Sequence, residues 1–215
     1  MKSLPLTNNH QPSTINHQPK IMIAIIDYDA GNVKSVQNAL KKLGFEAVIT
    51  SDIEKIKNAD KVIFPGVGEA SSAMKKLQER GLDAVIPNLK QPVLGICLGM
   101  QLMCNASEEG NTKALGIFDC EVKLFPNSDI VPHMGWNNVS EMKGKLLENI
   151  SEIDNFYFVH SYYAEIGEST TSVCDYITPF SATLEKDNFY AAQFHPEKSG
   201  DAGFKLLENF LNLRF

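Results

Sequence analysis

The feature that most constrains this chain is a glycine-flanked turn directly behind an apolar run, the segment PVLGICLGMQ at residues 92–101. An apolar strand that enters a tight turn and then a helix presents the middle side chain at the carboxyl edge of a sheet, as a G-x-S-x-G turn presents a serine. Here the middle residue is Cys97, at a predicted helix N-terminus that favours the thiolate. The segment therefore predicts an α/β fold with a nucleophilic cysteine. The alternative is a turn that needs Gly95 and Gly99 only for backbone geometry and packing.

A second strand-like run, at residues 188–194, ends in His195, Pro196 and Glu197. Ligands gather at the carboxyl ends of parallel strands, so a histidine just past one strand can meet a cysteine just past another. Pro196 stiffens the bend, and the Glu197 carboxylate can then hydrogen-bond the imidazole and fix its tautomer. We therefore expect Cys97, His195 and Glu197 to form a catalytic triad.

Three histidines beyond the first 20 residues are candidate bases for Cys97, namely His133, His160 and His195. His133 has no carboxylate near it in the sequence. His160 stands at the end of the strand-like run 155–159, but its neighbours are a serine and two tyrosines. A structural histidine at a strand end is the ordinary alternative for any of them, and the paired carboxylate favours His195 as the base.

The first half of the chain has the pattern of βαβ units. Strands are predicted at residues 21–27, 45–50, 60–64 and 92–96, with helices at 32–43 and 69–78. The run at 21–27 is almost entirely apolar and β-branched, which is typical of a strand covered on both faces. A parallel sheet follows from this pattern.

The second half has strands with few helices between them, at residues 115–125, 155–164, 172–177, 182–185 and 189–194. A final amphipathic helix is predicted from about Gly200, with Phe204, Leu207, Phe210 and Leu211 on one face. We expect one α/β domain over residues 21–215, with a mostly parallel central sheet flanked by helices and an added antiparallel portion in the C-terminal half.

Residues 1–20 have a different composition, rich in Asn, Gln, Pro, Ser, Thr and His, with NHQP at 9–12 and again at 16–19. Such a segment cannot bury a core, so we expect a disordered leader. No apolar stretch follows Lys2, which excludes a secretory signal. Met22 is an alternative start of the chain.

The charge and cysteine content limit the partners and the location. A formal net charge of −6 argues against nucleic acid or an anionic membrane as the main partner. The four cysteines, Cys97, Cys104, Cys120 and Cys174, show neither metal-ligand spacing nor a disulfide framework, so no metal site is expected. A reactive thiol persists in a reducing compartment, which indicates the cytoplasm. Except for Cys97, these cysteines are interpreted as core residues, with Cys104 on the helix that follows Cys97.

With the turn at Cys97, the terminal His-Pro-Glu and a PGVG loop at 65–68, the chain resembles the class I, or triad, glutamine amidotransferases from residue 21 to 215. More narrowly, the segments DYDAGN at 27–32, PHMGWN at 132–137 and YFVHSY at 157–162 are similar to those of glutaminase subunits of imidazole glycerol phosphate synthases. The leader is the only part that the family pattern does not explain.

The resemblance implies hydrolysis of L-glutamine to glutamate and ammonia, with no cofactor. It also implies a heterodimer that passes the ammonia to a (β/α)8-barrel cyclase subunit in histidine biosynthesis. The residues suit this chemistry, because a Cys97 thiolate can attack the amide carbon while His195 transfers protons. The backbone amides of Leu98 and of Val67 or Gly68 are expected to form the oxyanion hole.

By position in the family motif, Gln101, Glu109, Ser161 and Tyr162 are expected to bind glutamine. The Glu109 carboxylate suits the α-ammonium group of the substrate. Three of them have an ordinary alternative: Glu109 as part of a solvated turn, Gln101 as a helix surface residue, and Tyr162 as a core aromatic.

Trp136 is the single tryptophan, and its neighbours are turn residues, so we expect it in a turn and not in a strand. The alternatives are a buried ring and an interface anchor. The family resemblance favours an anchor for the cyclase subunit.

Two other functions remain open from the sequence. One is another glutaminase of the same fold, such as that of pyridoxal phosphate synthase, or a γ-glutamyl hydrolase. The other is a non-catalytic redox sensor or interaction subunit with the same cysteine turn. The presence of both His195 and Glu197 argues against the second.

Overall fold

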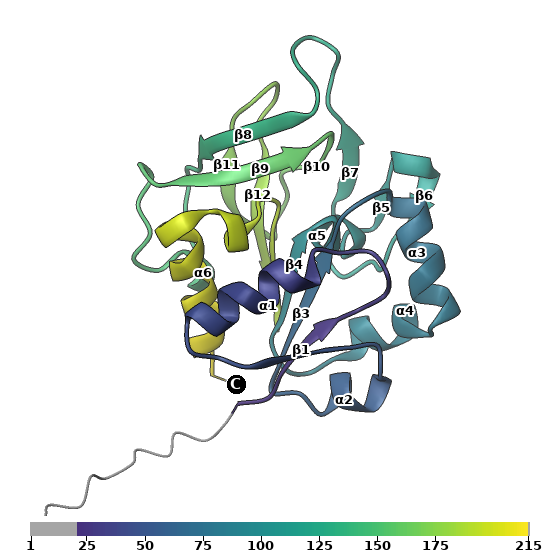
Figure 1. Cartoon of the computed structure of the whole chain (residues 1–215). Helices are drawn as coiled ribbons and strands as arrows, with labels where there is room; N and C mark the ends of the chain where they lie inside the picture. The colour runs from purple at the N-terminus through teal and green to yellow at the C-terminus, as the bar shows by residue number, and fades with distance from the viewer. Residues whose placement is uncertain (1–20, 215) are drawn as a thin grey trace, which may run out of the picture.

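The computed structural model describes residues 21–214. At its centre is a seven-stranded sheet with helices on both faces (Figure 1). In spatial order its strands are β11 (Thr170–Cys174), β12 (Phe180–Lys186), β13 (Phe189–Ala192), β4 (Val93–Cys97), β3 (Lys61–Gly66), β1 (Ile23–Ile26) and β2 (Ala47–Thr50). The strands from β13 to β2 are parallel, and β11 and β12 are antiparallel to their neighbours. The predicted fold class is confirmed.

Two helical layers cover the sheet. On one face lie α1 (Val33–Lys42) and α6 (Gly200–Asn212); on the other lie α2 (Ile53–Lys57), α3 (Ala70–Glu79), α4 (Leu82–Val85) and α5 (Leu98–Leu102) (Figure 1). Short 3₁₀ turns are η1 (Ile86–Asn88), η2 (Glu109–Asn111), η3 (Lys145–Leu147) and η4 (Pro196–Lys198).

Strand β1 shows how the sequence builds the two cores. Ile23 and Ile25 point into the core shared with α1 and α6, whereas Ala24 and Ile26 point into the core under α2 to α5. Successive side chains of a strand alternate between faces, so a strand covered on both sides has to be apolar throughout. The expected burial of this run is therefore found.

Helices α1 and α6 follow the predicted boundaries closely. After α1, Gly44 has a φ of +86°, and its N–H donates to the Lys41 carbonyl, so the glycine ends the helix in the left-handed region. In α6, Leu207, Phe210 and Leu211 are buried against the sheet, as the spacing predicts.

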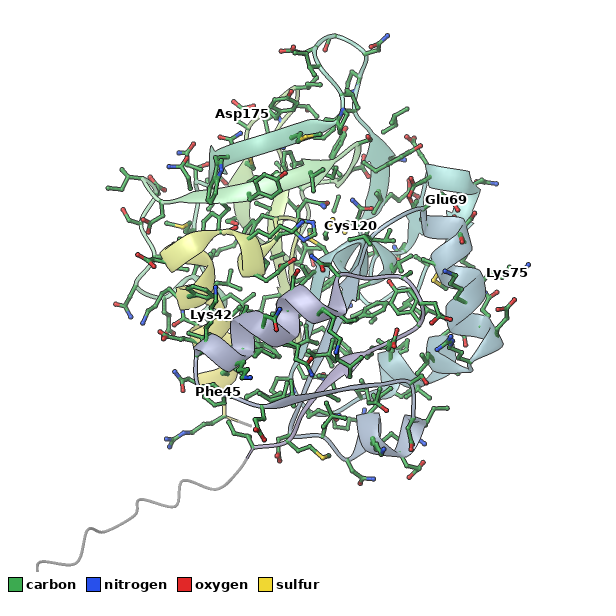
Figure 2. All side chains as sticks on the ribbon, in the orientation of Figure 1. Lys42, Phe45, Glu69, Lys75, Cys120 and Asp175 are labelled. Carbon is green, nitrogen blue, oxygen red and sulfur yellow. The ribbon has the colours of Figure 1, made fainter. Side chains whose placement is uncertain are left out.

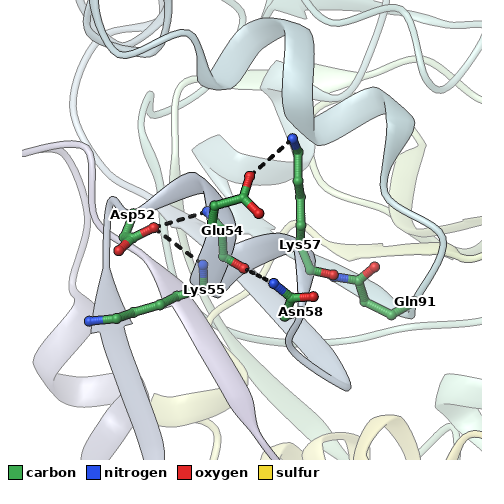
Figure 3. Close-up of polar contacts among 6 residues, drawn as sticks. All are labelled: Asp52, Glu54, Lys55, Lys57, Asn58 and Gln91. Carbon is green, nitrogen blue, oxygen red and sulfur yellow. Dashed lines mark hydrogen bonds and ion pairs between the residues drawn. The ribbon is translucent and has the colours of Figure 1, made fainter.

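Helix α2 is not predicted from the sequence, because it is short and mostly polar. Its start is fixed by Asp52, whose carboxylate accepts hydrogen bonds from the backbone N–H groups of Glu54 at 2.9 Å and Lys55 at 3.3 Å (Figure 3). This is an N-cap, which satisfies two amides that the helix itself leaves unpaired.

Two small sheets extend the C-terminal half. One contains β10 (Tyr162–Ala164), β7 (Glu121–Leu124), β5 (Ala106–Ser107) and β6 (Thr112–Lys113), and the other contains β8 (His133–Asn138) and β9 (Asn155–His160). The predicted strand at 155–164 is thus divided at Ser161, because β9 pairs with β8 and β10 pairs with β7.

The predicted strand at 115–125 is wrong for its first six residues. The N–H groups of Ile117 and Phe118 both donate to the Met103 carbonyl at 2.9 Å, so the chain wraps around the end of α5 before β7 begins. These apolar side chains are buried, but the backbone that carries them is a turn and not a strand.

The cysteine predictions are partly wrong. Helix α5 ends at Leu102, so Cys104 lies two residues beyond it, although its side chain is fully buried. Cys174 is also buried, and Cys120 (labelled in Figure 2) is partly buried against the same core as Cys104, with its sulfur 3.4 Å from that of Cys104.

The expectation that Trp136 lies in a turn is wrong as well. It lies in β8, antiparallel to β9 and opposite Tyr157. Met134 and Trp136 alternate with less exposed residues, so the period of a strand is present, but the apolar side chains face outward. Gly135 and the asparagines of this strand hide that period in the sequence.

The expectation of a disordered leader falls on residues outside those described. Among residues 21–214, none of the helices is long and apolar enough to cross a bilayer.

Candidate active site

The register of the central sheet brings Cys97 and His195 together. β13 pairs in parallel with β4, and Ala192 lies opposite Ile96. The residue after Ile96 is Cys97, and three residues after Ala192 comes His195, so both emerge at the same carboxyl edge.

Cys97 has an unusual backbone, with a φ of +54° and a ψ of −113°. This conformation costs energy for a non-glycine residue and turns the chain sharply from β4 into α5. A Cβ added at Gly99 would lie 1.9 Å from the Phe64 carbonyl oxygen, and one at Gly95 would lie 2.5 Å from the Met103 sulfur. The two flanking glycines therefore permit α5 to pack directly on the sheet.

The loop after β3 lines the site next to Cys97. Gly66 pairs with Cys97 in the sheet, which places Val67 and Gly68 beside the start of α5. Val67, Gly68, Cys97 and Leu98 all line one pocket.

His195 and Glu197 form a buried pair. The imidazole Nδ1 donates a hydrogen bond to Glu197 Oε1 at 2.9 Å, and the two side chains are 2% and 1% exposed. Burial by itself would lower the pKa of His195, but the neighbouring Cys97 and Glu197 side chains raise that pKa to about 9. The Nε2 atom is buried, without a hydrogen-bond partner, and the ring lines the pocket. It is thus available for a reacting group.

The turn that carries this pair is tied to β9. The His195 N–H donates to the Tyr157 carbonyl at 2.9 Å, and the Ser199 hydroxyl accepts from the Tyr157 N–H at 2.9 Å. The same hydroxyl donates to the His195 carbonyl at 2.6 Å. These bonds hold η4 in place, with Pro196 as its first residue.

His133 and His160 are occupied elsewhere. His160 Nδ1 lies 2.8 Å from the Tyr162 carbonyl, and its Nε2 lies 3.1 Å from His133 Nδ1. Burial is the main cause that lowers the pKa of His133 to about 4 and that of His160 to about 3, so both rings are neutral near pH 7. Both nitrogens of His160 are therefore in use, unlike the Nε2 of His195.

The pocket has a volume of about 340 Å³. It contains every residue that the sequence assigned to the oxyanion hole or to glutamine, together with Cys97 and His195, whereas Glu197 lies behind His195. Its lining residues are Val67, Gly68, Cys97, Leu98, Gln101, Glu109, Pro132, Val159, His160, Ser161, Tyr162 and His195.

Gln101 and Glu109 are held in this pocket by hydrogen bonds. The Gln101 Nε2 donates to the Tyr162 carbonyl at 2.8 Å, so this buried residue is not a helix surface residue. Glu109 Oε2 accepts from the Ala70 N–H at 2.8 Å, at the start of α3. Burial raises the pKa of Glu109, although this hydrogen bond lowers it. The nearby carboxylate of Glu69 (labelled in Figure 2) raises the pKa further.

Sequence reasoning missed Gln193 and the part that Pro132, Val159 and His160 take in lining the pocket. Gln193 is fully buried, and its Nε2 lies 3.8 Å from Cys97 Sγ. Its signal in the sequence is weak but present, because it is a polar residue between Ala192 and Phe194 in an otherwise apolar run.

Trp136 lies outside the pocket. Its side chain is 58% exposed and that of Met134 is 63% exposed, on the outward side of β8. The Trp136 ring makes an edge contact with Tyr157 at 6.0 Å between centroids. A buried core position is thus excluded for Trp136.

Comparisons with known proteins agree with this geometry. The family model described as glutamine amidotransferase class-I matches residues 24–213. The chain is 59% identical to the imidazole glycerol phosphate synthase subunit HisH of Bacteroides fragilis (strain YCH46), over 89% of this chain and 99% of that one. It is 57% identical, with the same coverage, to the HisH subunit of Bacteroides thetaiotaomicron.

A crystal structure of a glutamine amidotransferase is similar in fold, with a TM-score of 0.68 and 20% identity over 88% of this chain and 96% of that chain. Together, the match of the family model to most of the chain and the identity to these relatives decide the family. The chain belongs to the class I glutamine amidotransferases, in the group formed by the HisH subunits of imidazole glycerol phosphate synthase.

Proposed function

We propose that the pocket at Cys97 hydrolyses L-glutamine to glutamate and ammonia, and that the chain delivers the ammonia to a (β/α)8-barrel cyclase subunit of imidazole glycerol phosphate synthase. The single observation that carries the proposal is that Cys97 and His195 line one pocket, while Glu197 is hydrogen-bonded to the far side of the His195 ring. The folded domain is taken to begin near residue 21, and the location to be the cytoplasm.

Substrate binding uses the polar wall of the pocket. The Glu109 carboxylate, whose pKa burial raises, gains a partner when it meets the α-ammonium of glutamine. Gln101, Ser161 and Tyr162 line the same wall and orient the substrate. This places the side-chain amide of glutamine toward Cys97.

The first chemical step forms a thioester. The Cys97 thiolate attacks the amide carbon, and the oxygen becomes an oxyanion that accepts hydrogen bonds from the Leu98 amide and from the amide of Val67 or Gly68. Loss of one such donor typically costs about 3 kcal/mol of transition-state stabilisation. The imidazolium of His195 then protonates the amide nitrogen, the carbon–nitrogen bond breaks, and ammonia leaves.

The second step releases glutamate. Neutral His195 takes a proton from a water molecule, the hydroxide attacks the thioester carbon, and the carbon–sulfur bond breaks to restore the Cys97 thiolate. Glu197 stays ionised throughout and stabilises the imidazolium through its 2.9 Å hydrogen bond.

Ammonia must reach the cyclase without contact with bulk water, which would protonate it and remove its nucleophilicity. The exposed Met134 and Trp136 lie on β8, which follows the pocket residue Pro132, and they offer an apolar surface for the cyclase. We expect weak hydrolysis by the chain alone and faster hydrolysis in the complex.

Glutamate and ammonia release, measured with the full chain, the cyclase and the nucleotide-like ligand of the cyclase, tests the proposal. Cys97→Ala should abolish glutamine hydrolysis and keep the fold, while cyclisation with free ammonia should survive in the complex. Substantial hydrolysis by Cys97→Ala would show that the nucleophile is assigned wrongly.

Cys104→Ala is the matched control. It removes a buried thiol outside the pocket, so turnover should persist with at most a loss of about 1–2 kcal/mol in stability. If a different cyclase activated the chain, or if no cyclase did, another glutaminase of the same fold would be favoured.

A further inference from the structure

A buried polar chain lies behind the nucleophile and is not explained by the steps above. Gln193 is completely buried, and its Nε2 lies 3.8 Å from Cys97 Sγ. Its Oε1 accepts a hydrogen bond of 3.0 Å from Gln101 Nε2. Buried amides of this kind are costly unless each polar atom has a partner.

The directions of these hydrogen bonds follow from one atom. The carbonyl of Tyr162 can only accept, so the group of Gln101 that contacts it at 2.8 Å must be the NH₂. That NH₂ has a second hydrogen, which it donates to Gln193 Oε1. The other end of the Gln193 side chain is then its NH₂, and this group faces Cys97 Sγ as a donor.

The same carbonyl determines which ring nitrogens of the neighbouring histidines carry a hydrogen. His160 Nδ1 lies 2.8 Å from it and must carry a hydrogen, so in the neutral ring Nε2 is an acceptor. His133 Nδ1 then donates to that Nε2 across 3.1 Å. The Tyr162 carbonyl thus accepts from two side chains, and neither Gln101 nor His160 can turn around without loss of a bond.

The sulfur of Cys97 has two polar neighbours with opposite preferences. The Val159 carbonyl, 4.0 Å away, can interact favourably only with a protonated thiol. The Gln193 amide donates, and hydrogen bonds to an ionised acceptor are the stronger ones. When the proton passes to His195, the Gln193 amide remains as a partner for the thiolate.

We propose that Gln193 is a positioning residue whose side-chain amide, oriented by Gln101 and the Tyr162 carbonyl, donates a hydrogen bond to the Cys97 sulfur and stabilises its thiolate. The proposal rests on Cys97 as the nucleophile of the proposed function. It also gives Gln101 a defined part. Both amide hydrogens of Gln101 are used within the protein, so only its carbonyl oxygen is left for the substrate.

The test is the pH dependence of Cys97 alkylation in the full chain. Iodoacetamide reacts with the thiolate, and mass spectrometry of the Cys97 peptide separates this reaction from that of the partly buried Cys120. Gln193→Met keeps the approximate volume and removes the donor. The midpoint of its alkylation profile should rise by about one pH unit, as expected for one lost hydrogen bond to a charged group.

The control is Gln37→Met. Gln37 also donates a hydrogen bond, of 2.9 Å to the Ala47 carbonyl, but on α1 and away from the pocket. This variant should leave the midpoint unchanged. A lowered melting temperature for Gln193→Met with an unmoved midpoint would show a purely structural role and overturn the proposal.

If Gln193→Met does not fold, Gln193→Glu serves as the second variant, because it keeps the shape and the acceptor for Gln101. An ionised carboxylate beside the sulfur repels the thiolate, so the midpoint should also rise; an unchanged midpoint would contradict the proposal. The alkylation readout needs no turnover. Glutamine hydrolysis that survives in Cys97→Ala would instead overturn the proposed function, so the two failures are distinguishable.

Discussion

At the scale of single residues, the site is a set of groups that hold one another in a particular charge state. Glu197 and Cys97 raise the pKa of His195 against the effect of burial, whereas burial dominates at His133 and His160 and keeps them neutral. The three histidines are close in space but differ in the charges around them. Only His195 combines a carboxylate partner with a nitrogen that faces the pocket without a partner.

The raised pKa of His195 predicts a high-pH limit for activity. In the proposed mechanism ammonia leaves only after the imidazolium has protonated the amide nitrogen, so kcat/KM should fall as the pH rises through about 9. Glu197→Gln removes one of the groups that raise this pKa, and the limit should move to lower pH. Rates of glutamate formation between pH 6 and 10 measure both curves, and coincident limits would contradict the role of Glu197.

The same shift has a consequence for stability. Because the folded pKa lies above the unfolded value of about 6.5, the imidazolium stabilises the native state fully below that pH, and this contribution disappears as the pH rises toward 9. The free energy of unfolding of the wild type should therefore decrease over this range more than that of Glu197→Gln.

At the scale of elements, the pair β8–β9 connects the outer surface with the site. Its inner side carries His133 and His160, and its outer side carries Met134 and Trp136. Tyr157 on β9 contacts Trp136 with its ring and the turn of His195 with its backbone. A partner bound to this hairpin would thus contact residues one step from the His195–Glu197 pair.

Trp136→Ala should impair coupling between the subunits more than folding. A ring that is 58% exposed contributes little to the stability of the isolated chain, whereas truncation of an interface anchor can cost about 2 kcal/mol or more of binding. The ratio of glutamate formed to cyclised product should rise, because ammonia is lost. Ile153→Ala, at a position 84% exposed and outside the pocket lining, is the control.

An unchanged ratio, together with a markedly lower melting temperature of isolated Trp136→Ala, would show that Trp136 stabilises the fold of the isolated chain and does not anchor the cyclase. The ratio and the melting curve are measured on the same two variants and the wild type.

The histidines of this hairpin predict a loss of stability in acid. Their folded pKa values lie below the unfolded value, so the unfolded chain takes up protons that the native state does not, from about pH 6.5 down to pH 4. Each histidine should cost about 1.4 kcal/mol of unfolding free energy per pH unit in this range. Urea denaturation between pH 7 and 4 measures the slope.

His133→Gln is the informative variant. It removes one titrating ring and keeps an amide donor for His160 Nε2. The slope of the unfolding free energy against pH should therefore be shallower by the contribution of about one proton. A slope equal to that of the wild type would show that His133 is not buried in neutral form.

At the scale of the whole molecule, one sheet with two helical layers positions the proposed site, and the sheet edge that carries it is formed by the neighbouring strands β3, β4 and β13. β3 and β4 come from the first half of the sequence and β13 comes from the end of the chain. The site is therefore completed only when the last strand joins the parallel sheet beside β4.

Deletion of residues 1–20 should leave the melting temperature and glutaminase activity nearly unchanged. The polar composition of this segment provides no apolar face that could dock on the domain. Thermal melting and the coupled assay of the truncated and full-length chains test this expectation, and resistance of the segment to limited proteolysis would contradict it.

The sequence by itself determined the elements whose signals are local. The apolar run before Cys97, the glycines on either side of it and the β-branched run at 23–26 specify a strand, a turn and a buried strand through nearby residues alone. The His-Pro-Glu segment also predicted the hydrogen bond between His195 and Glu197, because the two residues are only two positions apart along the chain.

Only the tertiary structure decided the rest, because those contacts join residues far apart in the sequence. Gln193 lies 96 positions from Cys97, and its amide direction depends on the carbonyl of Tyr162 through Gln101. Strand β8 was hidden because its apolar residues face outward, against the usual pattern, and it is stabilised by pairing with β9. Burial and hydrogen-bond direction at such positions are properties of the assembled fold, and no local pattern encodes them.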